Sequence, residues 1–131
     1  MKSRYAIQER KNHLLMQISG PYDYWEFIDY PEIILRQCEA AAIFRIIVDL
    51  KNVTFVELST LELFFLGEKL AEKLRHRIKI AMVWNVRREG AFLEKVASNR
   101  EVSIRVFESV AKAKLWLLFD HQDEPSNLLK Y

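Results

Sequence analysis

The spacing of apolar residues changes from a period of two to a helical period near the start of the chain. Residues 14–19 alternate between apolar and more polar side chains until Gly20-Pro21, which predicts a strand ending at this pair. A weaker alternation around residues 5–7 predicts a shorter strand before it. From Asp23 to Ala42 the spacing is helical, with a separate helical turn within residues 24–30.

The next element is a short run of β-branched and apolar residues, Phe44–Leu50. Such a run is typical of a strand buried on both faces, and we expect it to be the central strand. A connector is predicted over Lys51–Val56. It leads to a helix from about Leu58 to Arg75, in which leucines recur along one stripe.

Two further strand-helix pairs follow. Strands are predicted over residues 78–84 and 102–107, with a helix around Glu89–Ser98 between them. Ser109 is placed to cap a last helix, whose inward stripe comprises Val110, Ala113, Trp116 and Leu117. The polar run after Phe119 predicts a loose tail over residues 120–131.

This order of elements predicts an α/β fold. Strands joined through helices pair in parallel by right-handed crossovers, with the helices covering the sheet. We therefore expect a mostly parallel central sheet of four to five strands covered by about four helices. The length of 131 residues suits one hydrophobic core, so residues 1–131 are predicted to form a single domain with its core over about 4–119.

Composition excludes several classes of protein. The 20 basic and 18 acidic residues are spread along the chain, which gives no reason to expect a nucleic-acid partner. The one cysteine, Cys38, rules out an internal disulfide and favours a reducing compartment, so cytoplasm is expected. No segment resembles a signal peptide or reaches the roughly 20 apolar residues of a membrane-spanning helix.

Candidate catalytic groups are few. His13, His76 and His121 are widely separated without zinc-ligand spacing, and three glycines are too few for the common nucleotide-binding motifs. We expect no metal and no cofactor. Asp49 and Glu57 flank the predicted connector at the carboxyl end of the central strand, where open α/β sheets bind ligands. An enzyme using either carboxylate is the least favoured reading, because no nucleophile or cofactor motif accompanies them.

Apolar residues in two regions point instead to a contact surface or a pocket. Aromatic residues gather in the segment Tyr22–Tyr30, and apolar residues surround much of the first half of the helix predicted from about Leu58. Most of these side chains are expected to pack in the core. Some are expected to stay exposed unless a partner covers them.

Three stretches of the chain, taken in order, resemble the STAS family of anti-sigma factor antagonists. Leu14–Asp23 is similar to the family's second strand with its glycine and following aspartate. Ile46–Leu61 resembles the strand, connector and helix start that hold the family's phosphorylation site. Ile104–Leu117 looks like its closing strand and helix. The resemblance covers residues 4–119 and implies a non-enzymatic regulatory module.

The family's phosphoacceptor motif, Asp-Ser-Ser-Gly, is largely replaced in this chain. The resemblance places Glu57 on the aspartate, Leu58 on the phosphorylated serine, Ser59 on the second serine and Thr60 on the glycine. Leucine has no hydroxyl to modify, so the usual switch is not available. Ser59 or Thr60 could substitute, although each would point about 100° or 200° further round the helix.

Two functions follow from these residues. The leading hypothesis is a regulatory or protein-interaction module that docks a partner protein, or a second copy as a homodimer. The expected surface comprises Asp23, Asp49, Glu57, Leu58, Ser59, Thr60 and Leu61. The alternative is a lipid or small apolar-ligand binding protein, with a pocket between the helix predicted from about Leu58 and the aromatic segment Tyr22–Tyr30.

Overall fold

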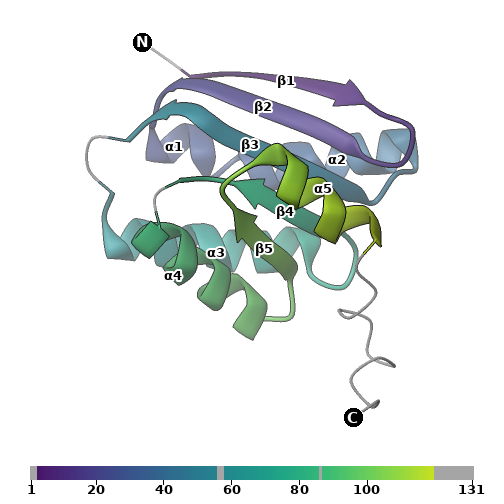
Figure 1. The fold of residues 1–131 in the computed structure, drawn as a ribbon. Coiled ribbons are helices and arrows are strands. Elements are labelled where there is room, and N and C mark those ends of the chain that lie inside the picture. Colours follow the sequence, from purple (N-terminus) through teal and green to yellow (C-terminus); the bar gives the residue numbers. More distant parts are fainter. Residues whose placement is uncertain (1–2, 56–57, 86, 120–131) are drawn as a thin grey trace.

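The computed structural model describes residues 3–55, 58–85 and 87–119. Within these ranges five strands and five helices follow one another (Figure 1). The strands are β1 (Arg4–Glu9), β2 (Leu14–Pro21), β3 (Arg45–Thr54), β4 (Lys79–Val83) and β5 (Ser103–Phe107). The helices are α1 (Tyr24–Phe27), α2 (Tyr30–Ala41), α3 (Thr60–Leu74), α4 (Arg87–Asn99) and α5 (Val110–Phe119).

The described strands form one sheet in the order β1-β2-β3-β4-β5. β1 runs antiparallel to β2, and the other three pairings are parallel. The parallel pairs are connected through helices, as a parallel crossover requires. The predicted α/β class and mostly parallel sheet are confirmed, with β3 in the middle.

Alternate residues of β3 separate two cores of unequal size. Ile46, Val48 and Leu50 belong to the larger core, which includes buried residues of α1, α2, α3 and α4. Ile47 faces the other way, into a smaller core built with α5. Figure 1 shows α5 alone in front of the strands. Within the described residues, one face of the sheet is thus covered by four helices and the other by one.

The aromatic segment folds as two helices rather than one. α1 is a single turn, and α2 begins shortly after it with Pro31 in its first turn, where the missing amide hydrogen costs nothing. The expected separate turn within residues 24–30 is confirmed. Phe27 and Tyr30 pack edge-to-face with ring centroids 5.0 Å apart, which ties the short helix to the larger core.

The predicted connector Lys51–Val56 was wrong over its first part. β3 continues past Leu50 to Thr54 because β2 also continues, and Asn52, Val53 and Thr54 pair with Ser19, Gly20 and Pro21. The pairing register shifts just before this stretch. Gly20 has a φ of 101°, a conformation that glycine adopts without steric cost. Val56 lies outside the described residues.

The start of α3 also differs from the prediction. The helix begins at Thr60 rather than near Leu58, because Ser59 is extended and caps it. The Ser59 hydroxyl accepts hydrogen bonds from the amides of Leu61 at 3.1 Å and Glu62 at 3.2 Å. These are two of the amides that a helix start leaves without a partner.

Candidate functional site

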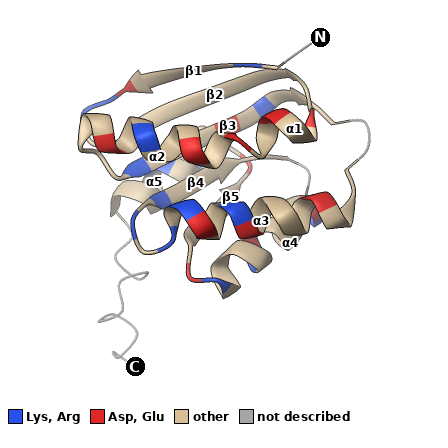
Figure 2. Cartoon of the chain, turned by 180° about the vertical axis from the view of Figure 1, so that it is seen from behind, with Lys and Arg blue, Asp and Glu red and all other residues tan. Residues whose placement is uncertain are grey.

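The N-terminal ends of α1 and α3 lie at the same end of the molecule (Figures 1 and 2). A hydrogen bond of 2.9 Å from the Tyr22 hydroxyl to Glu62 Oε1 joins the segment before α1 to the first turn of α3. Burial, and then this bond to Glu62, raise the pKa of Tyr22 well above its usual value. Tyr22 therefore stays protonated and keeps donating to Glu62 across the physiological range.

An exposed surface is built on these two helix starts, and we call it the α1–α3 surface. It comprises Asp23, Trp25, Ser59, Thr60 and Leu61, all of which are exposed. Trp25 is 75% exposed and Leu61 61%, and exposure this high is uncommon for tryptophan, which is highly buried on average. Phe65, one helical turn after Leu61, is also exposed. The expectation that some apolar side chains of α3 remain uncovered is confirmed.

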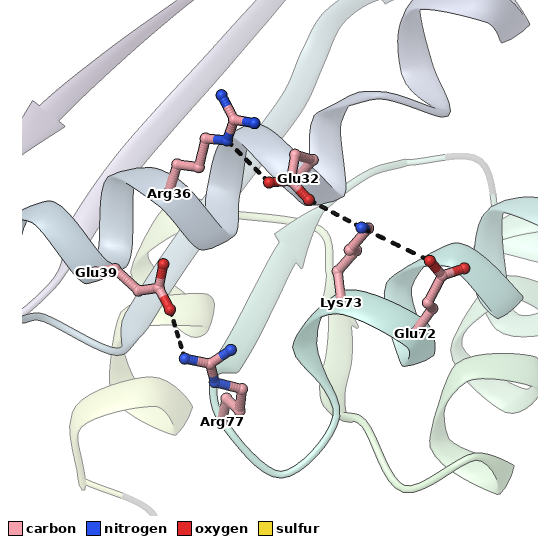
Figure 3. Close-up of polar contacts among 6 residues, drawn as sticks. All are labelled: Glu32, Arg36, Glu39, Glu72, Lys73 and Arg77. Atoms are coloured by element: carbon pink, nitrogen blue, oxygen red, sulfur yellow. Dashed lines mark hydrogen bonds and ion pairs between the residues drawn. The ribbon is translucent and has the colours of Figure 1, made fainter.

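Charged residues occupy the second half of α3 instead. Glu32 on α2 pairs with Arg36 at 2.8 Å and with Lys73 of α3 at 3.0 Å. Lys73 also lies 3.6 Å from Glu72 (Figure 3). The bond from Lys73, and then that from Arg36, lower the pKa of Glu32. This end of α3 is thus solvated and tied to α2, whereas the end that carries Leu61 is apolar.

Asp49 does not join the α1–α3 surface. It lies in the middle of β3 and is buried, so its expected place at the carboxyl end of the strand was wrong. It accepts a hydrogen bond from the amide of Lys51 at 3.0 Å, and Lys51 Nζ lies 3.8 Å from its other oxygen. These contacts offset the cost of burying the carboxylate. Glu57 lies outside the described residues, so its pairing with Asp49 stays a prediction.

Leu58 turns inward instead of lying on the exposed side of a helix. It is half-buried and packs against the larger core, because it precedes the capped start of α3. It lines an apolar cavity of about 60 Å³ between α3 and the aromatic segment. Other residues lining the cavity include Tyr22, Phe27, Phe55, Leu63, Leu66 and Trp84. A cavity therefore lies where the ligand-binding alternative placed one.

The described residues provide little for catalysis. They contain no cluster of three or more histidine, cysteine or acidic side chains that could hold a metal ion. His76 pairs with Glu101 at 2.6 Å on the surface, while His13 is buried. Burial, reinforced by Glu39, raises the pKa of the Cys38 thiol to about 11, which leaves it unreactive at neutral pH. No described helix is long and apolar enough to cross a membrane.

Comparison with solved structures shows which known fold the chain has. No family model and no curated protein matches the sequence, but several solved structures match the structure. An anti-sigma factor antagonist from Mycobacterium paratuberculosis has a TM-score of 0.55 at 13% identity, covering 88% of this chain and 94% of its own. SpoIIAA in its unphosphorylated form, also an anti-sigma factor antagonist, has a TM-score of 0.51 at 9% identity, covering 86% and 94%.

The chain has a SpoIIAA-like fold. An uncharacterized protein with that fold from Shewanella loihica PV-4 also matches, with a TM-score of 0.52 at 16% identity, covering 88% of this chain and 93% of its own. The STAS-like fold implied by the sequence resemblance is confirmed. At these identities the likeness concerns the fold alone, so any function has to come from the site.

Trp25 is the site residue that sequence reasoning missed. It was placed among aromatic residues expected mostly to pack in the core, but it projects from the single turn of α1. A signal was present, because a short helix can bury only one side and Phe27 occupies that side. Trp25 lies two residues away, about 200° round a helix, and therefore faces solvent.

Proposed function

We propose that this chain is a non-enzymatic, cytoplasmic regulatory module that docks a protein partner through the α1–α3 surface. The exposure of Trp25 together with Leu61 is the observation that carries the proposal. Tryptophan is enriched among the residues that dominate binding energy at protein interfaces. The similar structures that are named anti-sigma factor antagonists support a regulatory role.

The same surface supports constitutive rather than phosphorylation-switched binding. Leu58, which the sequence resemblance places at the family's acceptor position, has no hydroxyl and packs inward. Ser59 is exposed, but its hydroxyl already accepts two amide hydrogens at the start of α3. Modification of Ser59 or Thr60 remains a separate prediction, which phosphosite mapping of the native protein would test.

The proposal is tested by removing the two exposed apolar side chains together. We expect Trp25→Ser/Leu61→Ser to lose a partner that the wild type captures from its source, identified by mass spectrometry. The melting temperature should change little, because surface substitutions usually shift stability by about 0.5 kcal/mol or less. Light scattering of the same samples would show whether the partner is a second copy.

Leu115→Ser provides a matched control for this experiment. Leu115 is 62% exposed, almost the same as Leu61, but it lies on α5 across the sheet. The control should retain the captured protein. If the double variant also retains it, or if both variants lose it equally, the α1–α3 surface is not the docking site.

The ligand-binding alternative is supported by the apolar cavity, but its size limits what can enter. An engineered protein cavity of about 150 Å³ holds one benzene, whereas this one measures about 60 Å³. A larger apolar ligand would have to displace residues at its edge, such as Leu58 or Tyr22. The size therefore favours the interaction module as the leading function.

Leu58→Ser separates packing from ligand binding. We expect it to lower the free energy of unfolding by about 1–2 kcal/mol, because a half-buried leucine is truncated beside a core and a hydroxyl takes its place. Thermal denaturation measures this change, with exposed Thr60→Ser as the control. The accompanying measurement is native mass spectrometry of the wild type purified from its source. An apolar molecule that co-purifies with the wild type but not with Leu58→Ser would favour the ligand-binding alternative.

A further inference from the structure

α5 presents an apolar ridge to solvent between two lysines. Ala113, Trp116 and Leu117 point into the smaller core. At about 100° per residue, Ala111 and Leu115 then lie within about 40° of the outward direction, and Lys112 and Lys114 roughly 80° to either side. Leu118 is half-buried and packs against the smaller core. Phe119 follows Leu115 by one turn. Leu115 is 62% exposed and Phe119 67%.

The sheet face beneath α5 adds further positive charge. Strand alternation turns Arg45, Lys79 and Arg105 to the same side as Ile47 and Ala81, which pack against α5. Lys79 Nζ donates to the carbonyl oxygen of Trp116 at 3.2 Å and lies 4.4 Å from the centre of its ring. Basic side chains thus collect around the helix, although the charges along the sequence are evenly mixed.

Basic charge also reaches the turn between β1 and β2. Burial, and then the positive charges of Lys114 and Arg10, lower the pKa of His13 in that turn. Acidic residues also occur beside this face. Asp49 is buried and paired with Lys51, and Glu108 precedes the helix. Figure 2 shows that the opposite side, with α2 and α3, mixes acidic and basic residues.

We propose that α5 docks this protein on the surface of an anionic lipid membrane. The ridge of Ala111, Leu115 and Phe119 enters the interface, while Lys112 and Lys114 meet the lipid headgroups. Reversible membrane binding of this kind combines a shallow apolar insertion with a basic patch. Among the described residues α5 is the one helix on its side of the sheet, so no other described helix stands between the ridge and a flat surface.

Other occupants fit the ridge less well. A second copy related by a two-fold axis would set its Lys112 and Lys114 near the same lysines of the first copy, and like charges oppose such contacts. An acidic protein would need a concave surface to receive a convex helix, whereas a lipid interface deforms around it. Charge and shape together therefore favour the membrane.

Vesicle sedimentation with the full chain tests the proposal. We expect binding to equimolar phosphatidylglycerol and phosphatidylcholine vesicles, little binding to phosphatidylcholine alone, and loss of binding as salt rises from about 0.1 M to about 0.5 M.

Lys112→Gln/Lys114→Gln should weaken binding about 25-fold, or about fivefold for each lysine. Leu115→Ser/Phe119→Ser should weaken it by about tenfold or more. Lys95→Gln, at an exposed position of α4, should bind as the wild type does.

Each contrary result has a definite reading. A full chain that stays in the supernatant overturns the proposal, whether a second copy or residues 120–131 cover the ridge. If the wild type binds both vesicle types equally, the role of the basic flanks is overturned. The same follows if the lysine variant binds the anionic vesicles as well as the wild type does. A dimer in light scattering that Leu115→Ser/Phe119→Ser dissociates assigns the ridge to self-association, and binding to polyglutamate but not to vesicles assigns it to an acidic protein. Melting curves confirm that each variant is folded.

Discussion

Val48→Asp is expected to abolish folding. Val48 is buried in β3, the middle strand, between Met16 of β2 and Met82 of β4. Its side chain points into the larger core, which offers apolar neighbours there. An unpaired carboxylate in such a place costs several kcal/mol, against a total stability of about 5–15 kcal/mol for an ordinary domain. Circular dichroism should show no cooperative melt at neutral pH.

Asn52→Asp is the control for this substitution. It introduces the same carboxylate into the same strand, but at an exposed position that pairs with Ser19. We expect it to melt within a few degrees of the wild type, because exposed substitutions change stability little. A cooperative melt of Val48→Asp near that of the wild type would contradict the position of β3 at the centre of the fold.

Gly67→Val is expected to have the second largest effect, through the contact between α3 and α4. A Cβ atom at Gly67 would lie 2.5 Å from Cγ1 and 2.9 Å from Cβ of Val96, so the two helices would have to move apart. Overpacking of this kind costs about 3 kcal/mol, which lowers the melting temperature of a domain of this size by roughly 10 °C. Thermal denaturation followed by circular dichroism measures the shift.

Two comparisons isolate the steric cause. Glu68→Val places the same side chain at the next, exposed position of α3, where it should cost about 0.5 kcal/mol or less. Adding Val96→Ala to Gly67→Ala removes the closer contact, with Cγ1 at 2.5 Å, and leaves the one with Cβ at 2.9 Å. The double variant should therefore recover part of the stability that Gly67→Ala loses. If Gly67→Val melts like Glu68→Val, the close approach of α3 and α4 is not as the structure has it.

The candidate site was only partly predictable from the sequence, and its residues show why. Asp23, Ser59, Thr60 and Leu61 were predicted together, and the structure exposes all four at one end of the molecule. Asp49 was misplaced because the apolar run ends at Leu50, whereas β3 continues where β2 supplies backbone partners. Leu58 was misplaced because the extended conformation of Ser59 turns it toward the core.

The sequence alone determined the order and type of the secondary-structure elements, because hydrophobic periodicity and capping residues are local properties. It also determined the inward stripe of α5, of which Ala113, Trp116 and Leu117 are buried. The tertiary structure decided where β3 ends, since pairing with a distant strand sets that limit. It also decided that Trp25, Leu115 and Phe119 remain exposed, because exposure depends on whether another element covers a side chain, and no local pattern contains that information.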